Sequence, residues 1–366
     1  MNHHLPYWLA LHHLPMSRRK MLCLLEHFST PEQLFRAHKE ELLLIGASMA
    51  EIQAIQCPNW KVIETELAWA NKPYHAILSL QDDSYPPLLK QTADPPFILY
   101  VKGDQTVLSR KQLAMVGSRK ASPTGIKNAE QFAYHLSLAG LVITSGFALG
   151  IDTASHRGAL AAKRVTIGVF GTGLNHIYPA INRKLVQEVL DHQGALLSEF
   201  PLDAPPKAIH FPLRNRIIAG LSLGVLVVEA ARKSGSLITA HHALEYGREV
   251  FAIPGSIHHL TSRGCHYLIK QGAKLVECME DILEELNGFK GVLQSKNKQP
   301  PIDQSLPMDF SKQEKDLFEQ IGYEIIPIDM IILRTGLTRS EVSSILLSLE
   351  LRGYIQTVSG GYVRID

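Results

Sequence analysis

The sequence has little of several features that would mark a particular class of protein. Its charges nearly cancel, with 37 Lys and Arg against 35 Asp and Glu, a formal net charge of +2 and a pI of about 8.2. Nucleic-acid binding would therefore have to depend on locally clustered cations. The four cysteines have no paired short spacing, which argues against a zinc site or a disulfide framework. We expect free thiols in a reducing cytoplasm and no bound metal.

Long apolar runs and nucleotide-cofactor motifs are also missing. No stretch of 18 apolar residues is present, so no membrane span is predicted. The beginning of the chain lacks both a basic start and a long apolar stretch, so we expect no signal peptide. The sequence contains neither a complete G-x-G-x-x-G nor a Walker A motif, and we therefore predict no cofactor.

What is present is an ordinary globular composition divided into three blocks. Hydrophobic residues make up 45% of 366 residues, enough for two or three domains. Helical periodicity in residues 1–72 predicts an N-terminal helical domain. Residues 73–287 alternate β-branched runs with helical segments, as in a parallel sheet with helices on both faces. Residues 288–307 are polar and contain proline, as linkers do, and residues 308–366 form a small third domain.

Seven apolar runs of the middle block are predicted to be strands of this α/β domain. Most end in Gly, Ser or Pro and lead into a helical pattern, which predicts a Rossmann-like sheet. The predicted strands are Leu113–Val116, Leu141–Thr144, Val165–Val169, Leu196–Ser198, Val225–Glu229, Val250–Ile253 and Lys274–Val276.

The third block has the pattern of a winged helix. Thr338 and Glu341 fit a capping box at the start of an amphipathic helix, and Gly353 is placed to end it. Alternating residues on both sides of Gly360 and Gly361 then predict a β-hairpin.

Three glycine-containing motifs follow predicted strands: Met115–Arg119, Ser145–Asp152 and Gly171–Pro179. Glycine lets the backbone approach a ligand, and the helix start that follows offers free N–H groups and a positive dipole. Within the second motif we expect Asp152 to cap a helix or to hold the loop in place. Each motif alone is equally compatible with a plain turn between a strand and a helix.

The segment Lys207–Arg216 is the most informative motif. It places three cations near Phe211, so that Lys207, Arg214 and Arg216 could hold phosphates while the ring stacks on a base. The alternative is a plain surface loop that leads into an apolar helix. Because Arg-Asn-Arg directly before such a helix costs charge repulsion unless anions are present, we favour a binding role for the segment.

A fifth motif, Ser234–Ala240, places small hydroxyl residues and Gly235 before a helix, where backbone N–H groups could bind an anion. Glu229 precedes it at the end of a predicted strand. We predict that its carboxylate accepts a hydrogen bond and thereby orients Arg214 or Arg216.

All five motifs lie at carboxyl ends of predicted strands, which meet at one crevice in an open α/β sheet. Together they predict a site for a polyanion, single-stranded DNA. The candidate contacts are Gly117, Ser118, Arg119, Gly146, Phe147, Gly150, Gly171, Thr172, Gly173, Asn175, Lys207, Phe211, Arg214, Asn215, Arg216, Ser234, Gly235 and Ser236.

The order of these motifs resembles the DprA/Smf family of bacterial DNA-processing proteins. The matching segments are VGSR, SGxAxGID, GTGLNxxYP, FPxRNRIIAGLS, VVEA, SGSLITA and IPG. The resemblance implies an extended Rossmann fold, binding of single-stranded DNA without sequence preference, and no catalytic turnover. It further implies protection of incoming DNA in natural transformation and loading of RecA.

The resemblance also implies a homodimer formed through the end of the Rossmann domain. Here that segment contains His266, Leu268, Ile269 and Leu275, which could equally belong to the core. The N-terminal block resembles a SAM or helix-hairpin-helix domain, but its hairpin position, Leu14–Arg18, has no glycine to approach a phosphate.

Two alternatives remain at this point. The predicted recognition helix of the winged helix is nearly neutral, which favours protein contact or a weak DNA role over sequence-specific reading. The same Rossmann branch also resembles nucleotide phosphoribohydrolases, in which a glycine-rich loop precedes a catalytic glutamate. The matching loop here is Ser234–Thr239 and the glutamate Glu245, without the proline and double glycine of those enzymes.

Overall fold

The computed structural model describes residues 4–286, 310–322 and 325–364. The chain divides into two compact units, Met1–Leu293 and Gln294–Asp366. The predicted linker, residues 288–307, lies outside the described residues. In the described part, no helix is both long enough and apolar enough to cross a membrane.

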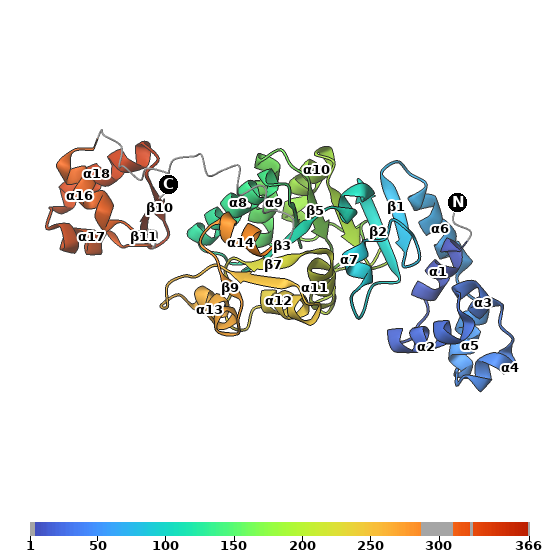
Figure 1. The fold of residues 1–366 in the computed structure, drawn as a ribbon. Helices are drawn as coiled ribbons and strands as arrows, with labels where there is room; N and C mark the ends of the chain where they lie inside the picture. Colours follow the sequence, from blue (N-terminus) through green and yellow to red (C-terminus); the bar gives the residue numbers. More distant parts are fainter. Residues whose placement is uncertain (1–3, 287–309, 323–324, 365–366) are drawn as a thin grey trace. The chain divides into compact units, whose positions relative to one another are not determined.

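The first unit contains a nine-stranded sheet with the order β1-β2-β6-β5-β4-β3-β7-β8-β9 (Figure 1). The seven predicted strands are present and pair in parallel. Their bounds are β3 Gln112–Val116, β4 Val142–Ser145, β5 Thr166–Val169, β6 Ala195–Ser198, β7 Gly224–Val227, β8 Glu249–Ala252 and β9 Lys274–Leu275.

Two strands that we did not predict extend the sheet at one edge. β1 (His75–Ser79) pairs antiparallel with β2 (Ile98–Gly103), which pairs antiparallel with β6. The short helix α7 (Pro87–Lys90) lies between them in sequence.

Helices cover both faces of the sheet because the side chains of each strand alternate. On β3, Leu113 and Met115 pack with α8 (Pro123–Leu138), α9 (Ile151–Ala161) and α14 (Met279–Glu285). Ala114 and Val116 face a second cluster, which includes apolar side chains of α11, α12 and α13. These three helices span His210–Leu221, Ser236–Glu245 and Arg263–Lys270.

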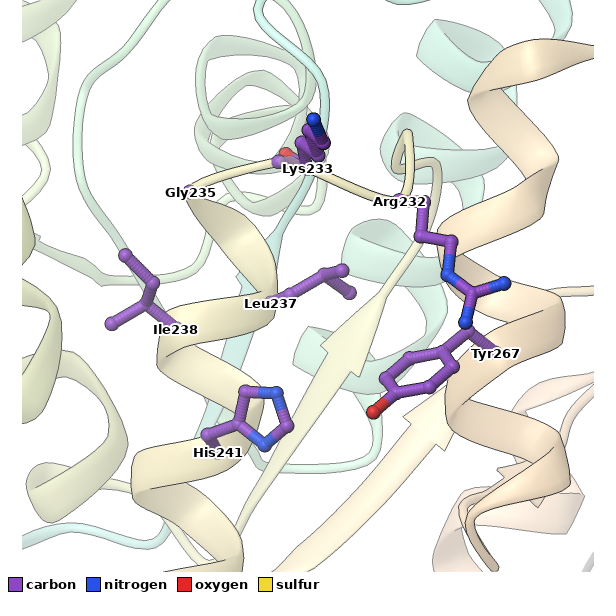
Figure 2. Close-up of a pocket in the computed structure, with 8 residues that line it drawn as sticks. Arg232, Lys233, Gly235, Leu237, Ile238, His241 and Tyr267 are labelled. Carbon is purple, nitrogen blue, oxygen red and sulfur yellow. The ribbon is translucent and has the colours of Figure 1, made fainter.

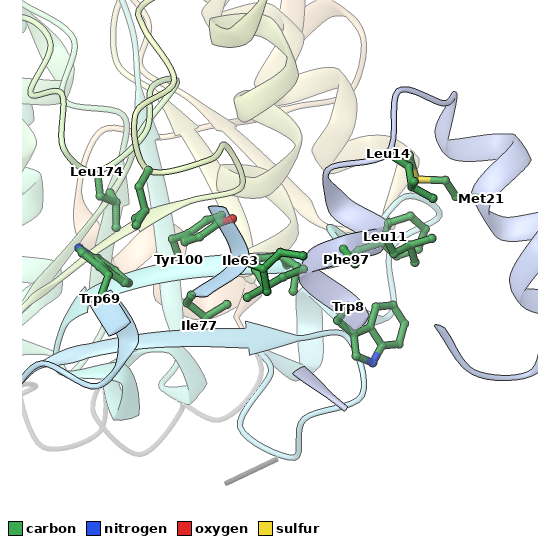
Figure 3. Close-up of a cluster of buried hydrophobic side chains, with 14 of the residues drawn as sticks. Trp8, Leu11, Leu14, Met21, Ile63, Trp69, Ile77, Phe97, Tyr100 and Leu174 are labelled. Carbon is green, nitrogen blue, oxygen red and sulfur yellow. The ribbon is translucent and has the colours of Figure 1, made fainter. Parts of the chain in front are cut away.

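The N-terminal helices share a hydrophobic cluster with the strands at the antiparallel edge and with α10 (Arg183–Asp191). Figure 3 shows Trp8 and Leu11 beside Phe97, and Ile63 near Tyr100. The six helices are α1 Leu5–His12, α2 Arg18–Phe28, α3 Pro31–Arg36, α4 Lys39–Leu44, α5 Met49–Gln56 and α6 Trp60–Ala70.

The second unit is a helix–turn–helix followed by a hairpin, which confirms the predicted winged-helix pattern. Thr338 and Glu341 form the predicted capping box, and Gly353 has φ +78° after the helix. The elements are α16 Lys312–Gln320, α17 Ile328–Thr335, α18 Arg339–Leu351, β10 Ile355–Val358 and β11 Gly361–Arg364.

Candidate nucleic-acid interface

Four of the five predicted motifs meet at one crevice beside the carboxyl ends of the parallel strands. The crevice has a volume of about 420 Å³. Residues after β3 and β4 line it together with residues of α11 and of the turn into α12, as the strand order predicts. From the predicted set, these are Gly117, Ser118, Arg119, Asp152, Phe211, Arg214, Asn215, Ser234, Gly235 and Ser236.

The rim of the crevice carries the Phe211 ring with a cation and a second aromatic ring close to it. The guanidinium carbon of Arg119 lies 5.5 Å from the centre of the Phe211 ring. The ring of Tyr178 lies 5.5 Å from the same ring, tilted by 46°, and Tyr178 is 46% exposed. Sequence reasoning missed Tyr178 as a contact, although the ring lies within the third predicted motif.

The surroundings of this rim are open to solvent and partly apolar. Ile209 and Leu213 are exposed at the start of α11, and Lys207 is exposed just before this helix. Arg119 and Lys120 are exposed on the loop after β3. Exposed cations next to aromatic rings are the combination with which proteins bind flexible single strands.

Close backbone packing fixes the loops that line the crevice. The Ser118 amide donates to the Glu229 carbonyl at 2.7 Å, and the Ile151 amide donates to the Ser118 carbonyl at 3.2 Å. Gly150 has φ +77°, and a Cβ there would collide with the Ser118 carbonyl. Gly117 is also packed, because its Cβ would meet Ile151.

The third motif supports the rim from behind. A Cβ at Gly171 would come within 3.0 Å of the Phe211 ring, so the ring packs directly on this backbone. Thr172 is buried and donates to the His176 carbonyl, and the Gly173 amide donates to the Ala204 carbonyl. These last two predicted contacts are therefore structural. Asn175 is exposed and donates to Asp203 at 2.7 Å.

Asp152 holds the second loop in place, as predicted. Its Oδ2 accepts hydrogen bonds from the amides of Gly146 at 3.2 Å and Ala148 at 3.3 Å. Burial raises the pKa of the Asp152 carboxyl, and the nearby Arg214 opposes that rise.

The prediction that Arg214 holds a phosphate at the surface is wrong in this structure. Only 3% of Arg214 is exposed, and its Nη1 donates to the carbonyls of Gly146 and Val169. Burial lowers its pKa to about 10, so it remains protonated at neutral pH. The segment was taken for a loop, but α11 already begins at His210 and directs Arg214 toward the sheet.

Arg216 is also not a surface contact. It is 8% exposed, pairs with Glu199 and donates to the Asp94 carbonyl at 2.7 Å. Arg18 from α2 pairs with Asp94 as well. These ion pairs tie α11 to the N-terminal helices, so the predicted repulsion within the Arg-Asn-Arg run is compensated by carboxylates instead of by an external anion.

Phe147 cannot contact a base because it is fully buried. Its ring stacks on His156 at 4.2 Å between ring centres and packs against Phe170. A Cβ at Gly168 would overlap this ring. Gly146 is equally enclosed, because its Cβ would meet Arg214.

Glu229 has a different partner from the predicted one. Its carboxylate accepts from the amide and the hydroxyl of Ser122, each at 3.0 Å, where Ser122 caps α8. It orients neither Arg214 nor Arg216. The actual link across the crevice is Asn215, whose amide donates to the Gly235 carbonyl at 3.2 Å.

The segment expected at a dimer surface is only partly exposed. Leu268 is 1% exposed and belongs to the core, which excludes it as a surface contact of this folded unit. Leu275 is exposed, while His266 and Ile269 are half-buried. The dimer itself remains a prediction.

Within the described part of the chain, the structure offers little support for the hydrolase alternative or for a metal site. Glu245, the glutamate of the hydrolase hypothesis, is exposed at the end of α12 and pairs with His242. It does not line the crevice. Within residues 4–286, 310–322 and 325–364, no three His, Cys, Asp or Glu side chains are grouped as a metal site would need.

Comparison with known families agrees with this architecture. The family model described as DNA recombination-mediator protein A matches residues 76–287, and the DprA winged helix domain matches residues 297–361. Protein Smf of Escherichia coli is 46% identical over 323 residues, covering 87% of this chain and 85% of that protein. DprA of Streptococcus pneumoniae is 48% identical over 207 residues, covering 57% of this chain and 73% of that protein.

Two solved structures are similar as well. The X-ray structure of DprA from Streptococcus pneumoniae has a TM-score of 0.67 at 37% identity, covering 77% of this chain and 98% of that one. DprA from Helicobacter pylori, solved to explain its single-stranded DNA binding mode, has a TM-score of 0.52 at 30% identity. It covers 60% of this chain and 96% of its own. From these matches and its own architecture, the chain belongs to the DprA/Smf family of DNA-processing proteins.

Proposed function

We propose that this chain binds single-stranded DNA along the rim of the crevice and acts as a recombination mediator. In this role it protects incoming DNA in natural transformation and delivers the strand to RecA. The DNA-binding part is supported by the geometry of the rim and by the single-stranded DNA binding of the Helicobacter pylori relative. The mediator part is supported by the family to which the chain belongs.

The proposal rests on the Phe211 ring, which has the Arg119 guanidinium and the Tyr178 ring next to it. Stacking of bases on aromatic rings is tolerant of sequence because every base has a flat face. In a duplex those faces are already stacked on each other, so this rim favours unpaired strands. The exposed Arg119 and Lys207 would hold the phosphates that connect the stacked bases.

The test is a titration of labelled oligo-dT and of a matched duplex into the protein and into Arg119→Ala. We expect the single strand to bind more tightly than the duplex, and Arg119→Ala to weaken binding. The matched control is Arg164→Ala, which removes an exposed cation just before β5, at the amino end of that strand, whereas the crevice lies at the carboxyl ends. Equal binding of both DNA forms, or equal loss in both variants, would contradict the proposal.

Three further parts of the proposal follow from the mediator role. A homodimer would use the surface around Leu275, with His266 and Ile269 beside it. A protein that exchanges DNA with RecA would work in the cytoplasm. Delivery to RecA is checked by assays of RecA filament formation on single-stranded DNA that this protein already covers. The dimer is checked by the mass of the protein in solution.

Catalytic turnover is not part of the proposal. The hydrolase alternative needs a glutamate at the crevice, and Glu245 does not line it. Release of free base from nucleoside monophosphates by the purified protein would restore that alternative.

A further inference from the structure

A second pocket lies beside the crevice, on the far side of the turn that leads into α12. It has a volume of about 470 Å³ and is bounded by that turn, by α12 and by Tyr267 of α13. Figure 2 shows Arg232 next to the Tyr267 ring, with the imidazole of His241 extending from α12 toward the same space. None of these three side chains belongs to the predicted contact set.

The charge of this pocket is positive and uncompensated. Arg232 and Lys233 are exposed, and neither has a hydrogen bond or ion pair within the part of the chain that the structure describes. Among the residues that the structure describes, no Asp or Glu lines the pocket. Two adjacent cations without a carboxylate repel each other, so this arrangement favours a bound anion.

The pocket also offers a ring for stacking. The guanidinium carbon of Arg232 lies 5.0 Å from the centre of the Tyr267 ring, which holds the cation at the edge of the pocket. This repeats the arrangement of Arg119 and Phe211 at the crevice. Arginine over an aromatic ring next to open space is a way to bind a nucleotide by its phosphate and its base.

The pocket and the crevice are adjacent. Both are lined by Ser234 and Gly235, so only this turn separates them. No atom outside the turn lies within 4 Å of a Cβ built on Gly235, so the space above it is open. A polyanion that leaves the crevice therefore meets open space above Gly235.

We propose that this pocket is a second nucleotide subsite for a DNA strand that has crossed Gly235. Arg232 and Lys233 bind a phosphate of that strand, and Tyr267 stacks on one of its bases. The subsite rests on the proposed function, since it extends the same bound strand. Strands just long enough for the crevice do not reach it, and longer strands do. As the DNA strand is lengthened, the affinity should therefore rise a second time, at the length that first reaches the subsite; this second rise is called the further step.

The experiment measures the affinity of the full-length protein for oligo-dT strands that increase by one nucleotide at a time. The double variant R232A/K233A should bind the short strands as the wild type does and lose the further step. For long strands its log–log salt slope should be smaller by about 1.4, which is two phosphate contacts at about 0.7 each. The matched control R110A/R164A removes two exposed cations that precede β3 and β5 and should leave both quantities unchanged.

The Tyr267 variants separate stacking from charge. Tyr267→Leu should weaken the long strands about five-fold or more, whereas Tyr267→Phe keeps the ring and should bind as the wild type. The mass of each variant in solution is measured at the same concentration. If R232A/K233A loses the step together with a smaller assembly mass, the pocket serves contact between copies and the proposal is overturned.

The failure of this subsite can be told from the failure of the proposed function. If the wild type binds no strand of any length, the proposed function fails. If all lengths bind but R232A/K233A keeps the wild-type step and slope, the second subsite is wrong and the crevice stands.

Discussion

At the scale of single residues, the site separates side chains that bind from side chains that hold the site together. At the rim, Tyr178 is exposed and the half-buried Phe211 ring lies next to it. Arg214 is buried, donates hydrogen bonds to the carbonyls of Gly146 and Val169, and has the carboxylate of Asp152 nearby. Substitutions of the two kinds should therefore affect different measurements.

Replacement of the missed ring is the first prediction. Tyr178→Leu should weaken binding of oligo-dT by about 1–3 kcal/mol, the usual cost of losing one stacked base. Because the ring is 46% exposed, the free energy of unfolding should change little. Fluorescence anisotropy checks the first effect and urea unfolding the second. Tyr134→Leu, on α8 and outside the crevice lining, is the control and should bind normally.

Replacement of the buried cation should have the opposite profile. Arg214→Ala leaves the buried Asp152 without its counter-charge and the carbonyls of Gly146 and Val169 without their donor. We expect a loss of about 3–5 kcal/mol in the free energy of unfolding. Arg119→Ala should lose almost none in the same urea experiment. Equal stability of the two variants would contradict the assignment of Arg214 to the fold.

The buried histidine His156 makes stability depend on pH. Burial lowers its pKa from 6.5 to about 3, so the unfolded chain binds a proton that the folded chain excludes. Stability should therefore fall as the pH drops below about 6.5, by up to about 1.4 kcal/mol per unit, until about pH 3. Urea unfolding across this range checks it. His156→Gln should show a shallower dependence, and an unchanged slope would argue against a neutral buried His156.

At the scale of elements, the turns at the crevice determine where the DNA strand can lie. Two glycines at the crevice play different parts. Gly150 has φ +77° and faces the Ser118 carbonyl, whereas Gly235 has φ −62° and has open space around it.

The two glycines should respond differently to alanine. Gly150→Ala should destabilise the fold by at least about 1–3 kcal/mol, from backbone strain and collision, and should disturb the Arg119 loop. Gly235→Ala should leave stability unchanged. Thermal unfolding of both variants is the measurement. A fully stable Gly150→Ala protein would show that Gly150 does not pack closely on the Ser118 carbonyl.

The sequence predicted the parallel elements better than the rest of the sheet. Seven strands read as continuous apolar runs because helices bury both of their faces. β1 and β2 lie at the antiparallel edge and were not recognised as strands. The start of α11 at His210 was also missed, because Arg-Asn-Arg was interpreted as a charged loop.

The same limit applies to the site. Arg119, Phe211 and the turn at Gly235 were predicted because each follows a strand that ends at the crevice. Arg214 and Arg216 were placed at the surface because their carbonyl and carboxylate partners are far away in sequence. A local pattern shows that a cation is present, but only the fold shows which group neutralises it.

At the scale of the whole molecule, the two units differ in the side chains that they expose. The crevice belongs entirely to the first unit. In the second unit, α18 exposes Leu347 and Leu351, whereas a helix that reads DNA would present cations. We therefore expect the second unit to contribute little to DNA affinity.

Removal of the second unit tests that expectation. A chain that ends at Leu293 should bind oligo-dT within about two-fold of the full-length protein, since the residues that line the crevice belong to the first unit. Parallel titrations of both chains are the measurement. A loss of ten-fold or more would place part of the DNA interface on the winged helix.

The most direct test of the central claim is the salt dependence of oligo-dT binding for the wild type and for Arg119→Ala/Lys207→Ala. If the rim holds phosphates with these two side chains, the log–log slope of the double variant should be smaller by about 1.4. A slope equal to that of the wild type would mean that the strand lies elsewhere on the molecule.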